Sequence, residues 1–261
     1  MKRLYRLLAC VAALSWPALV VGAEAEVGVI LMHGKWDRPP THVAMLARTL
    51  ESKGFKVSTP VMSWSGNREY DADYERTLAE IDAAAQSLRE KGATRIIVGG
   101  HSFGANAAIA YAGAGREVDG VMALAAGHVP DLPNFRNKVS SSVEKAKQMI
   151  GEGKGDSTAS FEDLNQGKTR SIRTTANIYL SFFDPDGLAS MPKSAAAIPR
   201  AVPFLWVIGT QDSLHSRGEN YVFSKAPPHP NSKYLVVTAN HADTPSVAAE
   251  QIVEWLASLG Y

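Results

Sequence analysis

Cysteine is almost absent from this chain of 261 residues, which contains only Cys10. A single cysteine excludes an intrachain disulfide framework and any zinc site built from several thiolates. An excess of one charge is lacking too, because 27 basic residues are matched by 26 acidic ones. This balance argues against a strongly basic nucleic-acid-binding protein and against an acidic disordered tail. Glycine (21) and proline (14) are near average, which excludes collagen-like and low-complexity chains.

Motifs that bind nucleotides or metals are also missing. No G-x-G-x-x-G opens a helix after a strand, and neither G-x-x-x-x-G-K-[ST] nor H-E-x-x-H occurs. The sequence therefore predicts no cofactor, no metal site and no nucleic-acid partner. What it does contain is 45% hydrophobic residues, which suit one sizeable core better than two small domains.

Residues 1–25 predict a secretory signal peptide rather than a part of the fold. Three basic residues open the chain: Lys2, Arg3 and Arg6. An apolar run follows over residues 7–21, and small residues permit cleavage after Ala23 or Ala25. A membrane anchor and a lipoprotein signal ending at Cys10 are the less favoured alternatives. We therefore expect a periplasmic or secreted mature protein without a membrane span.

The remaining chain, residues 26–261, alternates apolar runs with helical patterns. The runs, several without polar alternation, lie at 27–32, 56–60, 95–99, 120–126, 204–209 and 234–238. Apolar residues recur at helical spacing over 42–50, 74–88 and 245–259, the last with Thr244 as the expected N-cap. Strands that are apolar on both sides need helices on both faces. The pattern predicts a single α/β domain with a doubly wound, mostly parallel sheet.

One stretch, residues 129–202, is longer than a single crossover helix needs. It contains a predicted helix over 137–150, a Gly/Ser-rich hinge over 151–160 and a second patterned segment over 174–183. Long insertions at the carboxyl edge of a sheet often cover a site. We interpret the stretch as an insertion that forms a cap.

A G-x-S-x-G pattern, Gly100 to Gly104, stands directly after an apolar strand and before a run of small residues. A serine on a sharp strand-to-helix turn needs glycine two positions before and after it, because a Cβ there would clash with neighbouring chain. Such a turn exposes the Ser102 hydroxyl at a helix N-terminus, where a developing anion is stabilised. Ser102 is therefore the candidate nucleophile.

A serine hydroxyl needs a base to take its proton. His241 follows the last predicted strand, and a loop leaving that strand can reach Ser102 across the carboxyl edge of the sheet. His215 is the alternative base. His229 lies in a proline-rich turn, and His101 has a structural interpretation as a buried neighbour of the nucleophile.

The base in turn needs an acid to orient it. Asp212 lies three residues past Gly209, at the end of a strand and 29 positions before His241. It is favoured because it alone belongs to the loop that neighbours the histidine loop. The other candidates are Asp131, Asp184, Asp186 and Asp243.

An oxyanion hole needs two convergent backbone amides. One is expected from Phe103, the residue after the nucleophile. The other is expected from the loop after the first strand, where Gly34 permits a tight turn and Lys35 is the preferred donor, with Trp36 as the alternative. His33, in the same loop, is interpreted as a structural residue that pins the loop by hydrogen bonding.

These motifs together resemble the α/β-hydrolase superfamily. The matching features are His33-Gly34, Gly100-His101-Ser102-Phe103-Gly104, Asp212 and His241, in the order Ser, Asp, His, and the resemblance covers about residues 27–259. It implies a mostly parallel sheet, a cap inserted after the sixth strand of the family sheet and an acyl-enzyme mechanism, usually on esters.

The function that follows is a serine hydrolase that cleaves carboxylic esters, with a small-molecule ester as its partner. An acyltransferase with the same triad, and a binding protein that keeps the fold without the chemistry, are the alternatives. A fold alone does not fix the substrate.

Overall fold

The computed structural model describes residues 26–260, so the predicted signal peptide and Cys10 lie outside the described residues. Six strands form one parallel sheet in the order β2-β1-β3-β4-β7-β8. Their bounds are Val27–Met32 (β1), Lys56–Ser58 (β2), Arg95–Ser102 (β3), Gly120–Ala126 (β4), Phe204–Gly209 (β7) and Lys233–Val237 (β8). All residues of β1, β4 and β7 are buried, because helices cover both faces of the sheet. The predicted α/β fold is confirmed.

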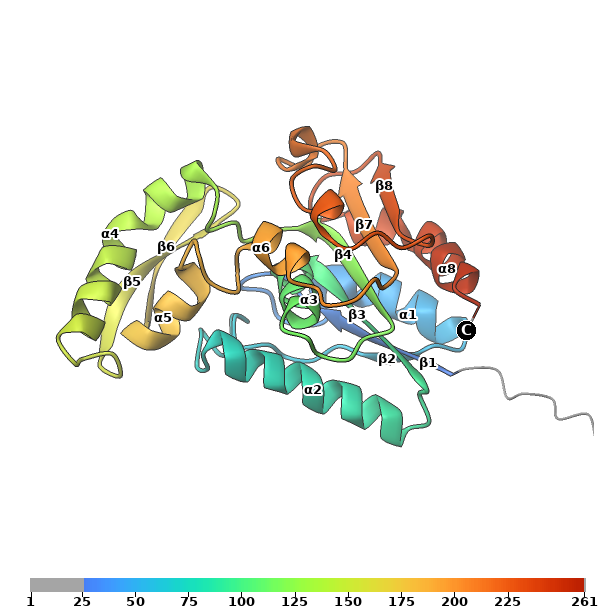
Figure 1. Cartoon of the computed structure of the whole chain (residues 1–261), viewed down its shortest axis with the longest axis horizontal. Coiled ribbons are helices and arrows are strands. Elements are labelled where there is room, and N and C mark those ends of the chain that lie inside the picture. The colour runs from blue at the N-terminus through green and yellow to red at the C-terminus, as the bar shows by residue number, and fades with distance from the viewer. Residues whose placement is uncertain (1–25, 261) are drawn as a thin grey trace, which may run out of the picture.

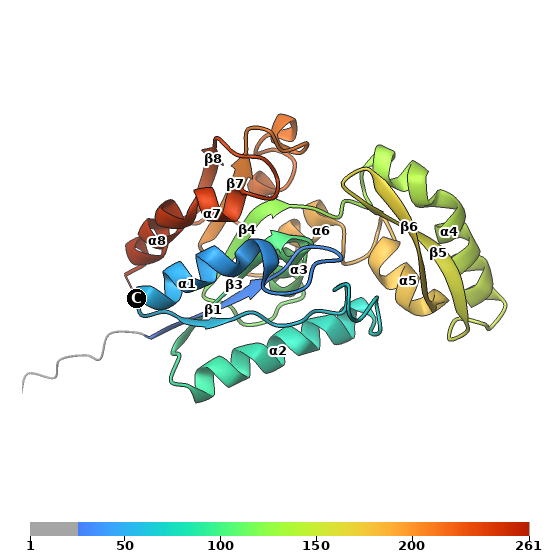
Figure 2. The same cartoon turned by 180° about the vertical axis from the view of Figure 1, so that it is seen from behind.

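The helices divide between the two faces of the sheet. On one face, α1 (Ala44–Ser52) and α8 (Ala249–Ser258) share a core with Val29, Leu31 and Leu205. On the other face, α2 (Tyr74–Glu90), α3 (Phe103–Gly113) and α6 (Met191–Ala196) pack on Ile30 and Val98. Figure 1 shows α3 in front of the sheet, and Figure 2 shows α1 on the opposite side. Short 3₁₀ turns lie at Thr41–Val43, His215–Arg217 and Phe223–Lys225.

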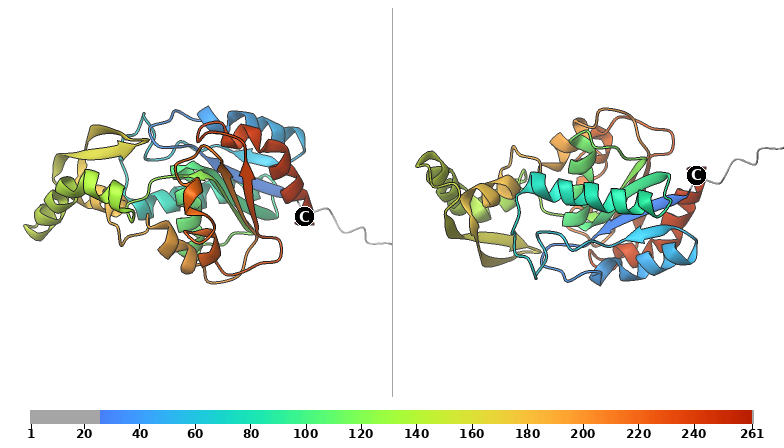
Figure 3. Two further views of the ribbon diagram at one scale, coloured as in Figure 1. Left: turned by 90° about the horizontal axis from the view of Figure 1, so that it is seen from above. Right: turned by 90° about the horizontal axis from the view of Figure 1, so that it is seen from below.

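The chain between β4 and β7 builds a separate layer at the carboxyl end of the sheet. It contains α4 (Pro133–Gly151), the antiparallel hairpin of β5 (Thr158–Asn165) and β6 (Lys168–Thr175), and α5 (Ala176–Phe183). We call residues 133–183 the cap. The cap projects away from the end of the molecule at which the C-terminus lies (Figures 1 and 3). It carries its own aromatic stack, in which Tyr179 lies 4.4 Å from Phe161 and 4.2 Å from Phe183 between ring centroids.

Three local expectations were wrong. The Gly/Ser-rich hinge expected over 151–160 gives way to strand β5 at Thr158, and the β5–β6 hairpin itself was not anticipated. The last helix is broken at Ala248 into α7 (Thr244–Val247) and α8. Thr244 lies inside α7 rather than at its N-cap, and its hydroxyl donates to the carbonyl of Asn240 at 2.7 Å.

Candidate active site

Ser102 sits where β3 turns into α3, with φ 55° and ψ −114°. A positive φ in a residue with a side chain is strained, so the surrounding structure must hold it. The flanking glycines make this possible. A Cβ on Gly100 would lie 2.5 Å from the carbonyl oxygen of Met32, and one on Gly104 would lie 2.4 Å from the same atom. The sharp turn expected from G-x-S-x-G is therefore present.

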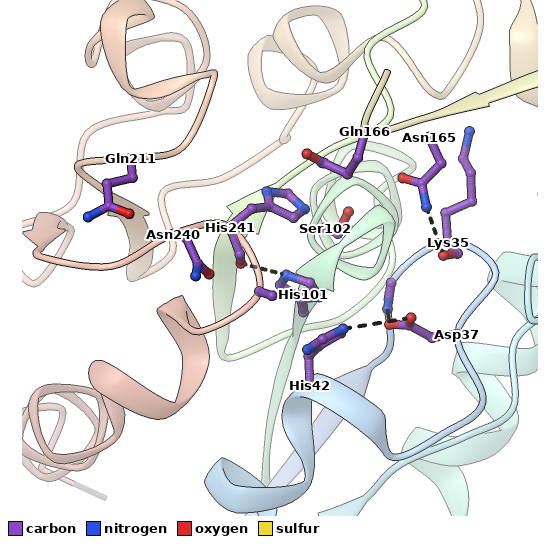
Figure 4. A pocket seen from close by; sticks show the side chains of 12 residues that line it. Lys35, Asp37, His42, His101, Ser102, Asn165, Gln166, Gln211, Asn240 and His241 are labelled. Carbon is purple, nitrogen blue, oxygen red and sulfur yellow. Dashed lines mark hydrogen bonds and ion pairs between the residues drawn. The ribbon is translucent and has the colours of Figure 1, made fainter. Parts of the chain in front are cut away.

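The structure brings His241 and Asp212 together. Nδ1 of His241 lies 2.6 Å from Oδ2 of Asp212, and the other carboxylate oxygen accepts the Leu214 amide at 2.8 Å. Their loops run side by side, because the Gln211 amide donates to the Ala239 carbonyl at 3.0 Å. The buried Nε2 of His241 has no hydrogen-bond partner among the described residues. Figure 4 shows the imidazole lying beside Ser102, and both residues line one cavity.

The other candidate acids are engaged elsewhere. The Tyr221 hydroxyl donates to Oδ2 of Asp131 at 2.9 Å. Asp184 accepts the amide of Asp186 in a turn, and Asp186 pairs with Lys193. Asp243 accepts from the side chain of Asn240. Of the five carboxylates considered from the sequence, Asp212 is the one that meets His241.

The loop after β1 leaves one suitable backbone amide. The Gly34 amide donates to Asp37, and the Trp36 amide donates to the carbonyl of Trp64 at 3.0 Å, which removes Trp36 as an alternative oxyanion donor. No hydrogen bond within residues 26–260 uses the Lys35 amide. Phe103 is the first residue of α3, so its amide has no carbonyl to meet within that helix. The Phe103 and Lys35 amides remain the predicted donors.

Two histidines near the site have structural contacts. Nδ1 of His33 lies 2.7 Å from the Gly34 carbonyl, and its Nε2 accepts the Met62 amide, so this ring pins the loop. Nε2 of His101 lies 2.9 Å from the carbonyl of His241. Burial lowers the pKa of His101 to about 3, with the His241 charge acting in the same direction. His101 is therefore a neutral hydrogen-bond donor that supports the His241 loop.

Asp163 of the cap, which the sequence did not single out, is the centre of a buried polar cluster. Its carboxylate accepts from Lys35 Nζ at 2.7 Å, from Trp36 Nε1 at 2.7 Å and from the Tyr70 hydroxyl at 2.8 Å. Asp163 is fully buried, and burial lowers the pKa of Lys35 while the Asp163 charge opposes that effect. The Asn165 side chain also donates to the Lys35 carbonyl at 3.2 Å. The cap is thus tied to the loop that carries a predicted oxyanion donor.

Two cavities meet at the candidate site. The first, of about 390 Å³, is lined mainly by polar side chains that include Asp37, His42 and Asn240 (Figure 4). The second, of about 500 Å³, lies between the cap and the sheet. Asn165, Gln166 and His241 line both cavities, so the tip of the β5–β6 hairpin stands between them. Within residues 26–260, no group of three or more His, Cys, Asp or Glu side chains is arranged to hold a metal ion.

Similarity to known proteins agrees with this geometry. The model of the "Alpha/beta hydrolase family" matches residues 29–255. The chain belongs to the alpha/beta hydrolase family. It is accordingly a hydrolase, and its sheet, elbow and strand-end loops lie within the matched range. No curated protein matches the chain.

Solved structures with the same fold share little sequence with this hydrolase. A Paleococcus ferrophilus monoacylglycerol lipase is 21% identical, with TM-score 0.63 over 89% of this chain and 94% of its own. A highly thermostable carboxyl esterase from Bacillus coagulans is 14% identical, with TM-score 0.64 over 91% of both chains. Est1E from Butyrivibrio proteoclasticus, solved with ferulic acid, is 17% identical, with TM-score 0.56 over 90% of both.

Proposed function

We propose that this hydrolase cleaves carboxylic esters through an acyl-enzyme on Ser102. The observation that carries the proposal is the 2.6 Å contact between buried Asp212 and His241, which lines the same cavity as Ser102. A base oriented by a buried carboxylate, with its other nitrogen unpartnered beside a serine on a strained turn, is the arrangement that nucleophilic catalysis requires. The esterases and lipases of the same fold favour an ester as the substrate.

The reaction has two steps. In the first, Nε2 of His241 takes the Ser102 proton while the oxygen attacks the ester carbonyl, and the Phe103 and Lys35 amides stabilise the oxyanion. The imidazolium then gives its proton to the departing alcohol, which leaves an acyl-serine. In the second step His241 takes a proton from water as its oxygen attacks the acyl-serine, and the imidazolium then returns that proton to the Ser102 oxygen as the carboxylic acid is released. Asp212 holds the ring in one tautomer and stabilises its charged form.

Replacement of the nucleophile tests the proposal directly. Ser102→Ala should reduce kcat on short-chain 4-nitrophenyl esters by several powers of ten and abolish labelling by a phosphonate that reacts with active serines. Ser52→Ala is the control, because this exposed serine lies at the end of α1 and its hydroxyl bonds only the Thr49 carbonyl. Undiminished labelling of Ser102→Ala would refute the assignment. Product analysis with an added alcohol separates hydrolysis from acyl transfer.

Export is a further part of the proposal. The basic start and apolar run of residues 1–25 support a cleaved signal, and hence a periplasmic or secreted enzyme. Of the helices within residues 26–260, not one combines the length and apolarity that a bilayer span requires. N-terminal sequencing of the exported protein should begin at Glu24 or Glu26, and a chain beginning at Met1 would contradict the prediction.

A further inference from the structure

We propose that the second cavity binds a negatively charged group of the substrate, and that Lys138 of α4 and Arg217 of the loop after β7 recognise it. The inference rests on the proposed ester hydrolysis and names the substrate class: esters that carry a free carboxylate, separated from the reacting ester by an apolar stretch.

The cavity extends from the nucleophile to the two cations. Gly127 lines it, and a Cβ on this glycine would lie 2.6 Å from the Ser102 hydroxyl oxygen, so the inner end of the cavity adjoins the reacting atom. Its lining comes from the cap and from the sheet domain alike, with Lys138 on the first side and Arg217 on the second. A substrate part held here would be attached to the ester at Ser102.

The lining of the cavity is apolar over much of its surface, alongside uncharged polar side chains such as Asn134 and Ser213. Six hydrophobic residues line it: Ala126, Val129, Leu132, Phe135, Leu164 and Leu214. Removing a chain of methylene groups from water against such a wall is favourable, at about 0.8 kcal/mol for each buried CH₂. The cavity therefore fits an aliphatic or aromatic spacer better than a chain of hydroxyl groups.

The charge of the lining is of one sign. Lys138 and Arg217 line the cavity, and no carboxylate does so among residues 26–260. Neither cation takes part in an ion pair within the described part of the chain, and Arg217 instead lies over the Tyr221 ring, 5.9 Å from its centroid. Asp131, which accepts from the Tyr221 hydroxyl, interacts with Arg217 only at longer range and forms no ion pair with it. A carboxylate on the substrate would supply the direct partner that neither cation has among residues 26–260.

The first cavity does not offer this environment. Its lining includes the carboxylate of Asp37, and the ammonium group of its lysine, Lys35, is turned into the buried contact with Asp163. The polar side chains there suit an uncharged hydrogen-bonding group. An anionic group is therefore assigned to the second cavity.

Matched substrate pairs test the proposal. In one pair the acyl side carries the charge, as in mono-4-nitrophenyl adipate, and in the other the alcohol side does, as in 6-acetoxyhexanoate. Each is compared with the neutral compound in which a primary amide replaces the carboxylate. We expect kcat/KM to be higher for the carboxylate by roughly two- to fivefold in at least one pair, since an ion pair of this exposure contributes at most about the upper factor. The preference should shrink in about 0.5 M NaCl, which screens the charges.

Variants identify the residues responsible. Lys138→Gln and Arg217→Gln should each lower the ratio of carboxylate to amide rates by roughly twofold or more. Lys147→Gln on α4 and Arg48→Gln on α1 remove the same charge from residues that do not line the cavity, and should leave the ratio unchanged. A ratio near one in both pairs, or a ratio indifferent to both variants, would overturn the proposal.

A binding measurement separates this inference from the proposed reaction. Calorimetry measures the binding of adipate and of adipamide to Ser102→Ala protein without turnover. Adipate should bind more tightly than adipamide, and the difference should shrink when Lys138 is also replaced by glutamine. Adipate preference without hydrolysis of any ester would retain the anion site and reject the esterase. Hydrolysis of both members of each pair at equal rates, with equal binding of adipate and adipamide, would support the esterase and reject the anion site.

Discussion

Position 104 accepts only glycine, because the backbone of β1 occupies the space that a side chain there would need. The Met32 carbonyl oxygen would lie 2.4 Å from a Cβ at this position, and backbone cannot move aside as a flexible side chain can. We expect Gly104→Ala to lower the free energy of unfolding by about 3 kcal/mol or more. Gly151→Ala is the matched control, because nothing lies within 4 Å of a Cβ there and alanine favours the end of α4. Urea unfolding measures both. Equal stability of the two variants would contradict the account of the turn.

Buried histidines make the stability of this protein fall in acid. Burial lowers the pKa of His33, His101 and His128 below the ordinary value of 6.5, and that of His101 to about 3. A histidine that is neutral when folded takes up its proton on unfolding, so its contribution is complete above pH 6.5 and is lost as the pH falls toward the folded pKa. Each such ring should remove up to roughly 1.4 kcal/mol per pH unit in that window.

Two measurements check this pH dependence. Thermal unfolding followed from pH 7 to pH 5 should give a falling Tm, and the His101 ring signals in NMR should not titrate between pH 5 and pH 8. A His101 ring that titrates near pH 6.5 would contradict its lowered pKa, and a flat Tm would contradict the loss of stability in acid.

At the scale of single residues, the sequence predicts where three residues of the candidate site lie and does not predict two others. Ser102, Asp212 and His241 each lie at or just after the carboxyl end of a strand of one parallel sheet, so their meeting at that edge follows from fold topology. Asp163 and Asn165 lie in a polar hairpin far along the chain, and no local pattern indicates that they fold back onto the Lys35 loop.

At the scale of elements, one buried carboxylate of the cap is bound to the loop after β1. Asp163 on β5 accepts from Lys35 and Trp36 of the loop after β1, more than 120 positions away. The same loop carries the predicted oxyanion donor, so any movement of the hairpin would be transmitted to the Lys35 peptide, whose carbonyl Asn165 also holds. We call the contacts of Asp163 with Lys35 and Trp36 the anchor. Because of the anchor, the position of the cap affects the geometry of the candidate site.

Removing the Asp163 charge should damage both stability and rate. In Asp163→Ala the Lys35 ammonium stays buried without its partner, which typically lowers the free energy of unfolding by about 3–5 kcal/mol. Lys35→Met combined with Asp163→Leu removes both charges and should recover much of that loss. Asp186→Asn is the control, because its partner Lys193 is exposed and surface pairs contribute about 1 kcal/mol at most. Urea unfolding and kcat on one ester are the readouts. A loss in Asp163→Ala no larger than the control's would refute the anchor.

The hairpin itself was missed for a physical reason. β5 and β6 form an outer layer of the cap in which Phe161, Asp163, Ile172 and Thr174 are the buried residues, and the others are at least partly exposed. So few inward residues, interrupted by charges, give little alternation for a sequence pattern to detect. The break between α7 and α8 at Ala248 was not predicted, because apolar residues keep their helical spacing across it.

At the scale of the whole molecule, regular alternation of strands and helices was enough to predict the sheet. Its central strands are buried on both faces, and their apolar composition carries that signal directly. The alternation of strands and helices does not predict how the cap packs on the sheet domain. In the structure, Phe182 and Phe183 of the cap belong to the same buried core as Phe103 and Trp64.

A shared core predicts that the cap and the sheet domain unfold together. Phe182 packs edge-on against Phe103, with centroids 5.8 Å apart, and Phe103 stacks on Trp64 at 4.6 Å, so opening the cap would expose apolar surface on both sides. The tryptophans of the described residues all lie in the sheet domain (Trp36, Trp64, Trp206 and Trp255) and report on it by fluorescence. A dye on Ser157→Cys, at the exposed turn before β5, reports on the cap. We expect one midpoint in urea for both signals. An earlier transition at the cap would mean that it moves as an independent lid, with the Asp163 anchor opening before the sheet does.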